Sequence, residues 1–186
     1  MFARTERLLL RPGWPEDAPA LARAIGEETI VRNLASAPWP YDLGHARAFL
    51  ETERRPHEAS FLVFRRTRGA PQLIGSAGLG RRPDGEIELG YWISRPNWGL
   101  GYATEAARAV LTIARDALRL DRIQAGHFLD NPASGRVLEK LGFRPTGLIA
   151  DRFSCGRREA APCKLFELDL KAGHEAIETA PAAMAA

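Results

Sequence analysis

The clearest hydrophobic pattern in the chain lies in residues 103–118, where apolar side chains recur every three or four positions and polar side chains occupy the rest. This period is that of an amphipathic helix with one buried face. The preceding residues 88–93 alternate between two faces and are rich in aromatic and β-branched side chains, which is typical of a β-strand. Gly99 and Gly101 stand between the two segments. The pattern therefore predicts a strand, a glycine loop and a helix in succession.

Similar patterns predict the other elements. A strand over residues 122–128 should lie parallel to that of residues 88–93, because a helix connects the two. Short turns such as Asp84-Gly85 predict antiparallel pairing elsewhere. The further expected elements are strands over residues 5–12, 60–66, 72–80, 146–153 and 164–170, and helices over 15–25, after Asp42, and between Asn131 and Gly142.

The composition fits one globular domain, because 45% of the 186 residues are hydrophobic. We expect the domain to span residues 1–170 and residues 171–186 to form a flexible tail without a periodic apolar face. The N-terminus has no apolar signal segment and no stretch is long enough to cross a membrane, so the expected location is the cytoplasm. Cys155 and Cys163 could face each other across a hairpin, but free thiols are expected in that compartment.

The charge distribution does not call for a nucleic-acid partner. The formal net charge is only +3, and the arginine pairs are scattered, as in solvated loops and strand ends. RNA contact through arginine-rich loops remains an alternative, which would show as binding that weakens steeply with salt. No clustering of histidine and cysteine predicts a metal site.

A glycine pair that opens a helix favours phosphate binding. The first N–H groups of a helix lack internal partners, the helix dipole is positive at this end, and glycine lets a ligand approach the backbone. A P-loop is excluded because no Gly-Lys-Ser/Thr follows the glycines. A dinucleotide-binding loop is excluded because Thr104 stands in place of its third glycine and five residues separate the strand from Gly99.

Residues 98–106, Trp-Gly-Leu-Gly-Tyr-Ala-Thr-Glu-Ala, resemble the pyrophosphate loop of the GNAT acetyltransferase superfamily, Gln/Arg-x-x-Gly-x-Gly/Ala. Trp98 takes the Gln/Arg position, which is similar to the Rim-type branch of ribosomal-protein N-terminal acetyltransferases. Residues 6–12, Glu-Arg-Leu-Leu-Leu-Arg-Pro, resemble the same branch. The resemblance implies acetyl-CoA as co-substrate, held mainly through the backbone of Trp98, Gly99, Gly101, Tyr102, Ala103 and Thr104.

The same resemblance implies a GNAT fold of the α+β class. Its core would be a central, mostly antiparallel sheet of six to seven strands, with a parallel pair splayed at the acetyl-CoA crevice and about four flanking helices. The match extends over residues 5–170, so it covers nearly the whole chain.

A second segment, residues 131–143, resembles the other acetyl-CoA-binding segment of the superfamily, Asn-x-x-Ala/Ser followed by Glu-Lys-x-Gly-Phe. The resemblance implies that Asn131 and Ser134 bind the coenzyme, although Asn131 is also what any well-capped short helix would show. Many members carry a tyrosine as general acid four residues after the Ala/Ser, and Leu138 stands there in this chain. The Rim-type branch implies that Ser134 contacts the coenzyme sulfur instead.

Acetyl transfer to an amine needs a proton acceptor for the amine and donors for the thioester oxygen. Glu88 is the candidate base, because it lies on the Trp92 face of a central strand, where burial would make its carboxylate a better proton acceptor at neutral pH. The alternative is that Glu88 belongs to a solvated face. Gly90 suggests a bulge or a close backbone approach, so that N–H groups near Ile93 could hold the pantetheine arm. We expect His127 to be a core or supporting residue.

The acceptor is the least determined part. The branch resemblance implies a primary amine, above all a protein N-terminal α-amine, and we expect Trp39 and Tyr41 to shape its side of the site. Two alternatives stay open: a small amine such as a polyamine or aminoglycoside, and an acetyl-CoA-binding sensor without catalysis. The expected partners are therefore acetyl-CoA and an amine, with no membrane or nucleic acid, and a homodimer is compatible with the sequence.

Overall fold

The computed structural model describes residues 1–53 and 55–171. The predicted tail, apart from Lys171, lies outside the described residues. Within the described part of the chain, no helix combines the length and apolar character that crossing a membrane would require.

The described residues form eight strands, five α-helices and two short 3-10 helices. The strands are β1 (Ala3–Arg4), β2 (Leu8–Arg11), β3 (Ala59–Arg65), β4 (Gln72–Arg81), β5 (Ile87–Ile93), β6 (Arg122–Phe128), β7 (Arg144–Ser154) and β8 (Glu159–Asp169). The helices are η1 (Pro15–Asp17), α1 (Ala18–Ile25), α2 (Glu28–Val31), α3 (Leu43–Glu51), η2 (Arg95–Asn97), α4 (Tyr102–Asp116) and α5 (Pro132–Lys140).

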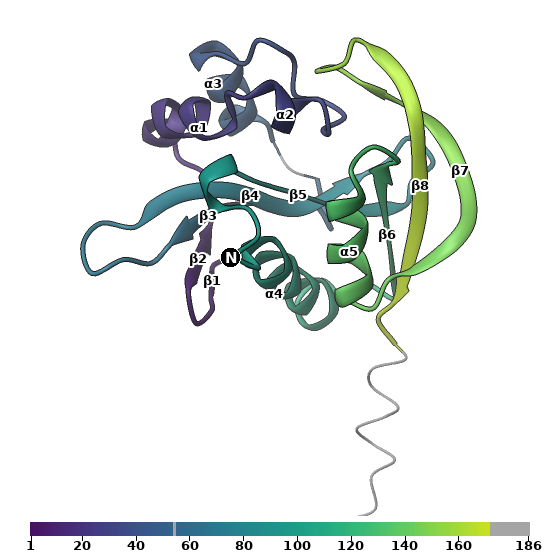
Figure 1. Ribbon diagram of the computed structural model, residues 1–186. Helices are drawn as coiled ribbons and strands as arrows, with labels where there is room; N and C mark the ends of the chain where they lie inside the picture. The colour runs from purple at the N-terminus through teal and green to yellow at the C-terminus, as the bar shows by residue number, and fades with distance from the viewer. Residues whose placement is uncertain (54, 172–186) are drawn as a thin grey trace, which may run out of the picture.

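All eight strands form one sheet in the order β1-β2-β3-β4-β5-β6-β8-β7. Neighbours pair antiparallel except β5 and β6, which are parallel, as the helical connection between them predicts. The α+β class and the parallel pair of the expected GNAT fold are therefore confirmed. In Figure 1 the sheet crosses the centre of the molecule, with α1, α2 and α3 above it and α4 and α5 below and in front.

The sheet has an extra strand because β1 forms before the predicted strand of residues 5–12, of which residues 8–11 form β2. The Thr5 hydroxyl accepts a hydrogen bond from the Leu8 N–H at 2.9 Å, and the Thr5 N–H donates to the Leu8 carbonyl at 3.0 Å. This local turn reverses the chain, so that β1 pairs back onto β2. The extra helix is the four-residue α2, in a stretch that the sequence indicates only as irregular.

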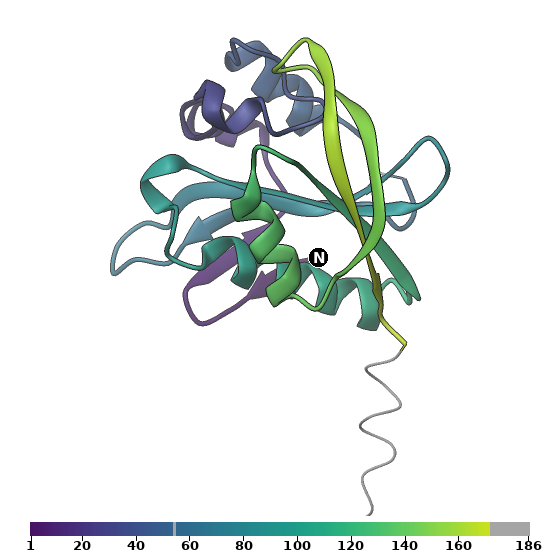
Figure 2. The same ribbon diagram turned by 45° about the vertical axis from the view of Figure 1, so that its right-hand side comes forward.

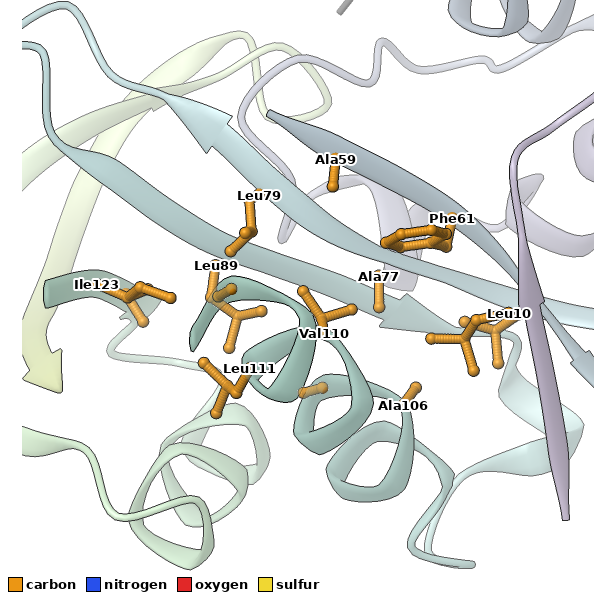
Figure 3. Packing of buried hydrophobic residues seen from close by; sticks show 14 of the residues in the cluster. Leu10, Ala59, Phe61, Ala77, Leu79, Leu89, Ala106, Val110, Leu111 and Ile123 are labelled. Atoms are coloured by element: carbon orange, nitrogen blue, oxygen red, sulfur yellow. The ribbon is translucent and has the colours of Figure 1, made fainter. Parts of the chain in front are cut away.

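The main core lies between the sheet and α4. The apolar stripe of α4 faces side chains that point downward from the central strands, and Figure 3 shows Val110 and Leu111 beneath Leu79 and Leu89. Leu138 of α5 joins the same cluster and is 1% exposed. The 3.6-residue pattern of the sequence thus forms the buried face that it predicts.

A second core covers the opposite face of the sheet. There α1 and α3 pack on Leu62 and Phe64, and α2 forms a smaller cluster with residues before α3. Trp92 contacts both clusters. Asp42 begins α3 as expected, since its carboxylate accepts from the His45 N–H at 2.9 Å.

The C-terminal hairpin β7–β8 arches over the edge of the sheet, from the side of α4 and α5 to the side of α1–α3 (Figure 2). At its far end the Ser154 hydroxyl donates to the carbonyl oxygens of Arg32 and Leu34, and the Cys155 N–H donates to that of Ala35. The hairpin therefore ties the last strands to the segment after α2. β8 lies between β6 and β7, so the two closing strands enter the sheet in reverse order.

Close strand packing makes a sharp stability prediction at Gly78 of β4. A methyl group there would overlap the carbonyl oxygen of Ala59 in β3, whereas at Gly80, two residues along the same strand, it would meet nothing. We expect Gly78→Ala to lower the free energy of unfolding by about 1–3 kcal/mol. Gly80→Ala should leave it unchanged or raise it by about 0.5 kcal/mol. Urea unfolding of the two variants checks this, and equal stabilities would contradict the packing described for β3 and β4.

Candidate active site

The site begins where the parallel strands β5 and β6 separate. The one register pair between them in the described chain joins Glu88 to Gln124, near the start of both strands. Beyond that pair the strands diverge, and β6 runs away from β5 in front of the sheet (Figure 1). The half of β5 from Leu89 to Ile93 therefore has a backbone edge that β6 does not cover. This is the splayed parallel pair that the GNAT resemblance implies.

The exposed edge of β5 can hydrogen-bond a ligand in the manner of a missing strand. The Ser94 N–H donates to Ile74 of β4 at 2.7 Å, so the Ile93 N–H, one residue earlier, points to the opposite edge, where β6 has diverged. The Ile93 carbonyl accepts from the indole N–H of Trp98 at 2.6 Å. Trp98, which takes the place of the usual Gln/Arg, thus fastens the start of the glycine loop to the end of β5.

The glycine loop leaves the first turn of α4 open. Gly99 and Gly101 have φ angles of 74° and 80°, a left-handed conformation that favours glycine. Gly101 is the N-cap of α4, and no side chain caps the helix there. The first intrahelical bond runs from the Glu105 N–H to Gly101, so the N–H groups of Tyr102, Ala103 and Thr104 have no partner within the helix. These residues fit a diphosphate at the helix N-terminus.

Glu105 anchors this helix start to the N-terminal strands. Its carboxylate accepts from the Thr5 hydroxyl at 2.6 Å and from the Arg7 side chain at 2.7 Å, while Arg7 also donates to the Leu100 carbonyl. Burial opposes the charge of Glu105, but the hydrogen bonds from Thr5 and Arg7 outweigh it and hold its pKa below the usual value. The loop is therefore held by a charged contact on the side opposite β5.

A pocket of about 470 Å³ lies beside this anchor and gathers arginines that the sequence suggests are scattered. Arg7 lines it together with Arg65 at the end of β3 and with Arg66 and Arg68 from the turn that follows. Arg66 is fixed by two carbonyl oxygens of the β1–β2 turn, at 3.0 and 2.7 Å. The fold therefore concentrates positive charge near the N-terminus of α4.

The second predicted segment forms the start of α5. Asn131 is its N-cap and accepts a hydrogen bond from the Ser134 N–H at 3.3 Å, so its side chain has the capping role that the sequence leaves open. Ser134, in the first turn, directs its hydroxyl to Tyr91 of β5, with the two hydroxyl oxygens 2.8 Å apart. Leu138 lies one turn further along, inside the core. Ser134 thus faces β5 from the far side of the gap, and Asn131 caps the helix turn that carries it.

His127 lies under α5 and not in the gap. Its Nδ1 is 2.9 Å from the Phe128 carbonyl oxygen, and its ring packs against Phe166 at 5.5 Å between centroids. A side chain at Gly135 would meet its Nε2 at 2.7 Å. The supporting role expected for His127 agrees with these contacts.

Glu88 points to the opposite face of the sheet from Tyr91, because the two residues are three apart on one strand. Its carboxylate is 23% exposed and accepts from Arg152 of β7 at 2.5 Å, with Arg82 at 3.7 Å on its other oxygen. The surroundings of Glu88 are therefore ionic, where the sequence suggests simple burial beside Trp92. Gly90 pairs with Gly78 without a register shift, so the expected bulge is absent, but the space above Gly90 is open.

The residues expected on the acceptor side gather on this face. Trp39, Tyr41 and Trp92 pack in one cluster with α2, and Arg158 of the C-terminal hairpin donates to the Trp39 carbonyl at 3.0 Å. Burial, with the Asp42 carboxylate nearby, raises the pKa of Tyr41 to about 12. Aromatic side chains therefore gather on the same face of the sheet as Glu88, around Trp92.

The two cysteines are free and lie apart along the hairpin. Cys163 of β8 is paired with Ala150, while the Cys155 backbone contacts the segment after α2. Burial raises the pKa of the Cys163 thiol above its usual value. Among the described residues, no three histidine, cysteine, aspartate or glutamate side chains come together in a group that could hold a metal ion.

Two side chains of the site are missed by reasoning from the sequence. Tyr91 reads only as a core-facing position of a strand, and Arg152 only as one residue of a closing strand. The sequence could have indicated a role for Tyr91, because the hydroxyl of a core-facing tyrosine needs a hydrogen-bond partner. Nothing local to Arg152 indicates its pairing with Glu88.

Comparison with known proteins gives one consistent fold. A family model described as an acetyltransferase (GNAT) domain matches residues 7–144. The uncharacterized N-acetyltransferase YoaA of Bacillus subtilis (strain 168) is 30% identical over 152 residues, which cover 78% of this chain and 84% of that protein. A GNAT-family acetyltransferase from Bacillus anthracis superposes with a TM-score of 0.77 at 23% identity, covering 92% of this chain and 99% of the other. RimL, a ribosomal α-N-protein acetyltransferase in complex with coenzyme A, superposes with a TM-score of 0.75 at 16% identity, covering 91% and 98%.

The glycine loop yields a test with a matched control. Gly99 and Gly85 both have positive φ angles and open space where a side chain would lie, but Gly85 belongs to the β4–β5 turn. Alanine at either position should cost a similar stability, about 1 kcal/mol. Only Gly99→Ala should weaken binding of acetyl-CoA, by about tenfold or more, measured by calorimetric titration. Equal affinities in the two variants would show that the loop does not touch the ligand.

The anchor of α4 predicts a pH dependence. Because the folded-state pKa of Glu105 is lowered, its contribution to stability is present above its ordinary pKa and is lost as the pH falls through the folded value. We expect Glu105→Gln to lower the free energy of unfolding by about 1–3 kcal/mol at pH 7 and by progressively less in acid. Denaturant unfolding from pH 7 to pH 3 measures this. The exposed Glu16, replaced by Gln, is the control, and a pH-independent gap would contradict the assignment.

Proposed function

Since the chain belongs to the GNAT acetyltransferase family, it is an acetyl-CoA-dependent N-acetyltransferase, and we propose that its acceptor is a protein N-terminal α-amine. The main observation in support of this site is that β5 and β6 diverge past Glu88. The uncapped start of α4 lies on one side of the opening and Glu88 on the other. The site residues below are part of the same proposal.

The coenzyme side uses backbone groups more than side chains. The N–H groups of Tyr102, Ala103 and Thr104 hold the diphosphate, with Gly99 and Gly101 keeping the loop free of side chains. Trp98 acts by fixing the loop to Ile93, whose N–H faces the pantetheine arm. Asn131 shapes the first turn of α5 and so places Ser134. Bound there, acetyl-CoA supplies the activated acetyl group.

Glu88 serves as the proton acceptor for the amine. Its ion pair with Arg152 keeps the carboxylate in one place on the acceptor face, and Arg82 contacts its second oxygen. Because both oxygens already face guanidinium groups, a water molecule is the natural carrier of the proton from the amine to Glu88. Trp39 and Tyr41, with Trp92, form the apolar wall against which the amine's neighbouring groups lie.

The acetyl group passes directly to the amine. A route through an acetylated cysteine needs a thiolate, and Cys163, the thiol near Glu88 and Arg152, is held neutral by burial. Leu138, which is buried in the core, occupies the position where other family members have a tyrosine as general acid. The leaving thiol is a stable enough anion that a strong acid is not required.

Two lines support a protein α-amine as the acceptor. The first is that the sequences of residues 98–106 and 6–12 resemble the Rim-type branch. The second is that the fold is shared with RimL, whose name states a ribosomal α-N-protein acetyltransferase activity. The two other hypotheses are a small amine such as a polyamine or aminoglycoside, and an acetyl-CoA sensor.

The test measures the release of coenzyme A thiol from acetyl-CoA with N-terminal peptides, polyamines and aminoglycosides as acceptors. We expect turnover with peptides whose α-amine is free and none with the same peptides blocked at the N-terminus. Glu88→Gln should lower kcat by about 100-fold. Glu86→Gln is the matched control, because Glu86 lies just before β5 and is also ion-paired, with Arg122 at 3.0 Å. Its kcat should stay within about twofold of the wild type.

Each hypothesis has its own outcome in this assay. Turnover with polyamines or aminoglycosides alone would replace the protein acceptor by a small amine. Binding of acetyl-CoA with no turnover on any acceptor would favour the sensor. An equal loss of kcat in the Glu86 and Glu88 variants would show that Glu88 is not the proton acceptor. Both losses would then reflect a general effect on the sheet.

A further inference from the structure

The contact between Tyr91 and Ser134 has no counterpart in the sequence motifs. The two residues come from the elements that border the gap, Tyr91 from β5 and Ser134 from the first turn of α5. Their hydroxyl oxygens are 2.8 Å apart, and the Tyr91 oxygen is also 3.1 Å from the Ser134 carbonyl oxygen. The tyrosine therefore bridges the opening that the divergence of β5 and β6 creates.

The hydrogen atoms of this pair can be arranged in two ways. In the first, Tyr91 donates to the Ser134 carbonyl and the Ser134 hydroxyl donates back to Tyr91. In the second, Tyr91 donates to the Ser134 hydroxyl oxygen, and the Ser134 proton is free to point at a third group. The second arrangement turns Ser134 into a donor whose oxygen is already polarised by Tyr91.

Tyr91 remains a donor throughout the working pH range. Burial raises its pKa to about 12, although the hydrogen bond with Ser134 lowers it somewhat. The Tyr91 ring packs against the main core, so its hydroxyl cannot swing to another partner without moving the ring. A neutral, fixed hydroxyl suits the orientation of a neighbour better than it suits proton release.

We propose that Tyr91 is a positioning residue that turns the Ser134 hydroxyl toward the sulfur of coenzyme A, so that the pair stabilises the departing thiolate. This inference rests on the proposed acetyl transfer at the same crevice. Ser134 contacts the sulfur and Tyr91 acts through Ser134. The pair would thus take over the role that the resemblance gives to a tyrosine on α5, since the matching position here is the buried Leu138.

The faces of β5 separate the two halves of the reaction. On the Glu88 face, the amine nitrogen forms its bond to the acetyl carbon and loses a proton toward Glu88. The bond from that carbon to sulfur breaks, and its electron pair remains on sulfur as a thiolate. On the Tyr91 face, the Ser134 hydroxyl donates a hydrogen bond to this thiolate, which later takes a proton from water.

The first experiment measures the titration of the thiol of bound coenzyme A, and it needs no acceptor. A free cysteine thiol titrates at about pH 8.5, and a hydrogen bond to the charged form lowers the midpoint. We expect the ultraviolet absorbance of the thiolate to appear about one pH unit lower in the wild-type complex than in the Tyr91→Phe and Ser134→Ala complexes. Coenzyme A lacking its sulfur should bind all three proteins equally, which reports that the crevice is intact.

The second experiment is a double-mutant cycle on kcat with the best acceptor found. Tyr91→Phe should lower kcat about fivefold and Ser134→Ala about tenfold, with little change in KM for acetyl-CoA. Because Tyr91 acts through Ser134, the double variant should be no slower than Ser134→Ala alone. Ser134→Thr keeps a hydroxyl and should restore most of the activity and the low thiol titration.

A matched control accounts for the loss of a buried hydroxyl as such. Ser76 of β4 donates to the Phe61 carbonyl at 2.9 Å and pairs with Trp92, so its side chain lies on the opposite face of the sheet from Tyr91, and Ser76→Ala should leave the thiol titration unchanged. Thermal unfolding compares it with Tyr91→Phe. If Tyr91→Phe does not fold, Tyr91→Met takes its place in both experiments, because methionine also removes the hydroxyl while its flexible side chain fills the core position.

Two results would overturn the proposal. One is a thiol titration that is the same in the wild type, Tyr91→Phe and Ser134→Ala. The other is a double variant whose kcat loss equals the product of the two single losses, which would mean that Tyr91 acts independently of Ser134. A protein that shifts the thiol titration as expected but transfers acetyl to no amine would refute the proposed function and retain the paired hydroxyls as a thiol-binding feature.

Discussion

The architecture depends on the separation of two parallel strands that begin as neighbours. Parallel strands need a crossover connection, and here the crossover is the glycine loop with α4, which packs back under the sheet. The strands share one register pair at Glu88 and then part, so the backbone of β5 is left uncovered within the core of the molecule. Such an edge is costly unless a ligand or side chain meets it. The helix start, the Tyr91 bridge and the first turn of α5 all lie around this one opening.

The alternation of a single strand gives the site its two sides. Glu88 and Trp92 face the helices α1–α3, while Tyr91 and Ile93 face α4 and α5. The charged and aromatic groups on the Glu88 face, which we propose as the acceptor side, are thereby kept apart from the Tyr91–Ser134 hydroxyl pair by the thickness of the sheet. In the proposed reaction the amine and the leaving thiol meet different surroundings, although Glu88 and Tyr91 are only three residues apart on β5.

Elements with strong local signals could be predicted from the sequence. β6 has the bounds that its apolar alternation predicts, and α5 begins and ends at its Asn and Gly signals, because these features depend on neighbouring residues alone. The extra strand β1 depends on one threonine side chain that closes the turn into β2, and the place of β8 between β6 and β7 depends on tertiary packing.

The same division applies to the site. The glycine loop and the capping residue Asn131 are visible in the sequence because backbone geometry requires those residue types. The partners of Glu88 and Ser134 are not, because Arg152 and Tyr91 lie 64 and 43 residues away from them in the chain. Chemical roles that depend on such pairs become apparent only when the fold brings them together.

The arch of β7 and β8 also bears on the order in which the protein forms. Its far end contacts the carbonyl oxygens of Arg32, Leu34 and Ala35, which are more than 100 residues earlier. During synthesis the α4 core can assemble while this hairpin is still missing, since most of its members precede β7. The hairpin contacts beside Trp39, on the proposed acceptor side, by contrast form only after β8 has emerged. Contacts of such long sequence separation form late in folding, so the α4 side of the nascent chain forms before the face that we propose for the acceptor.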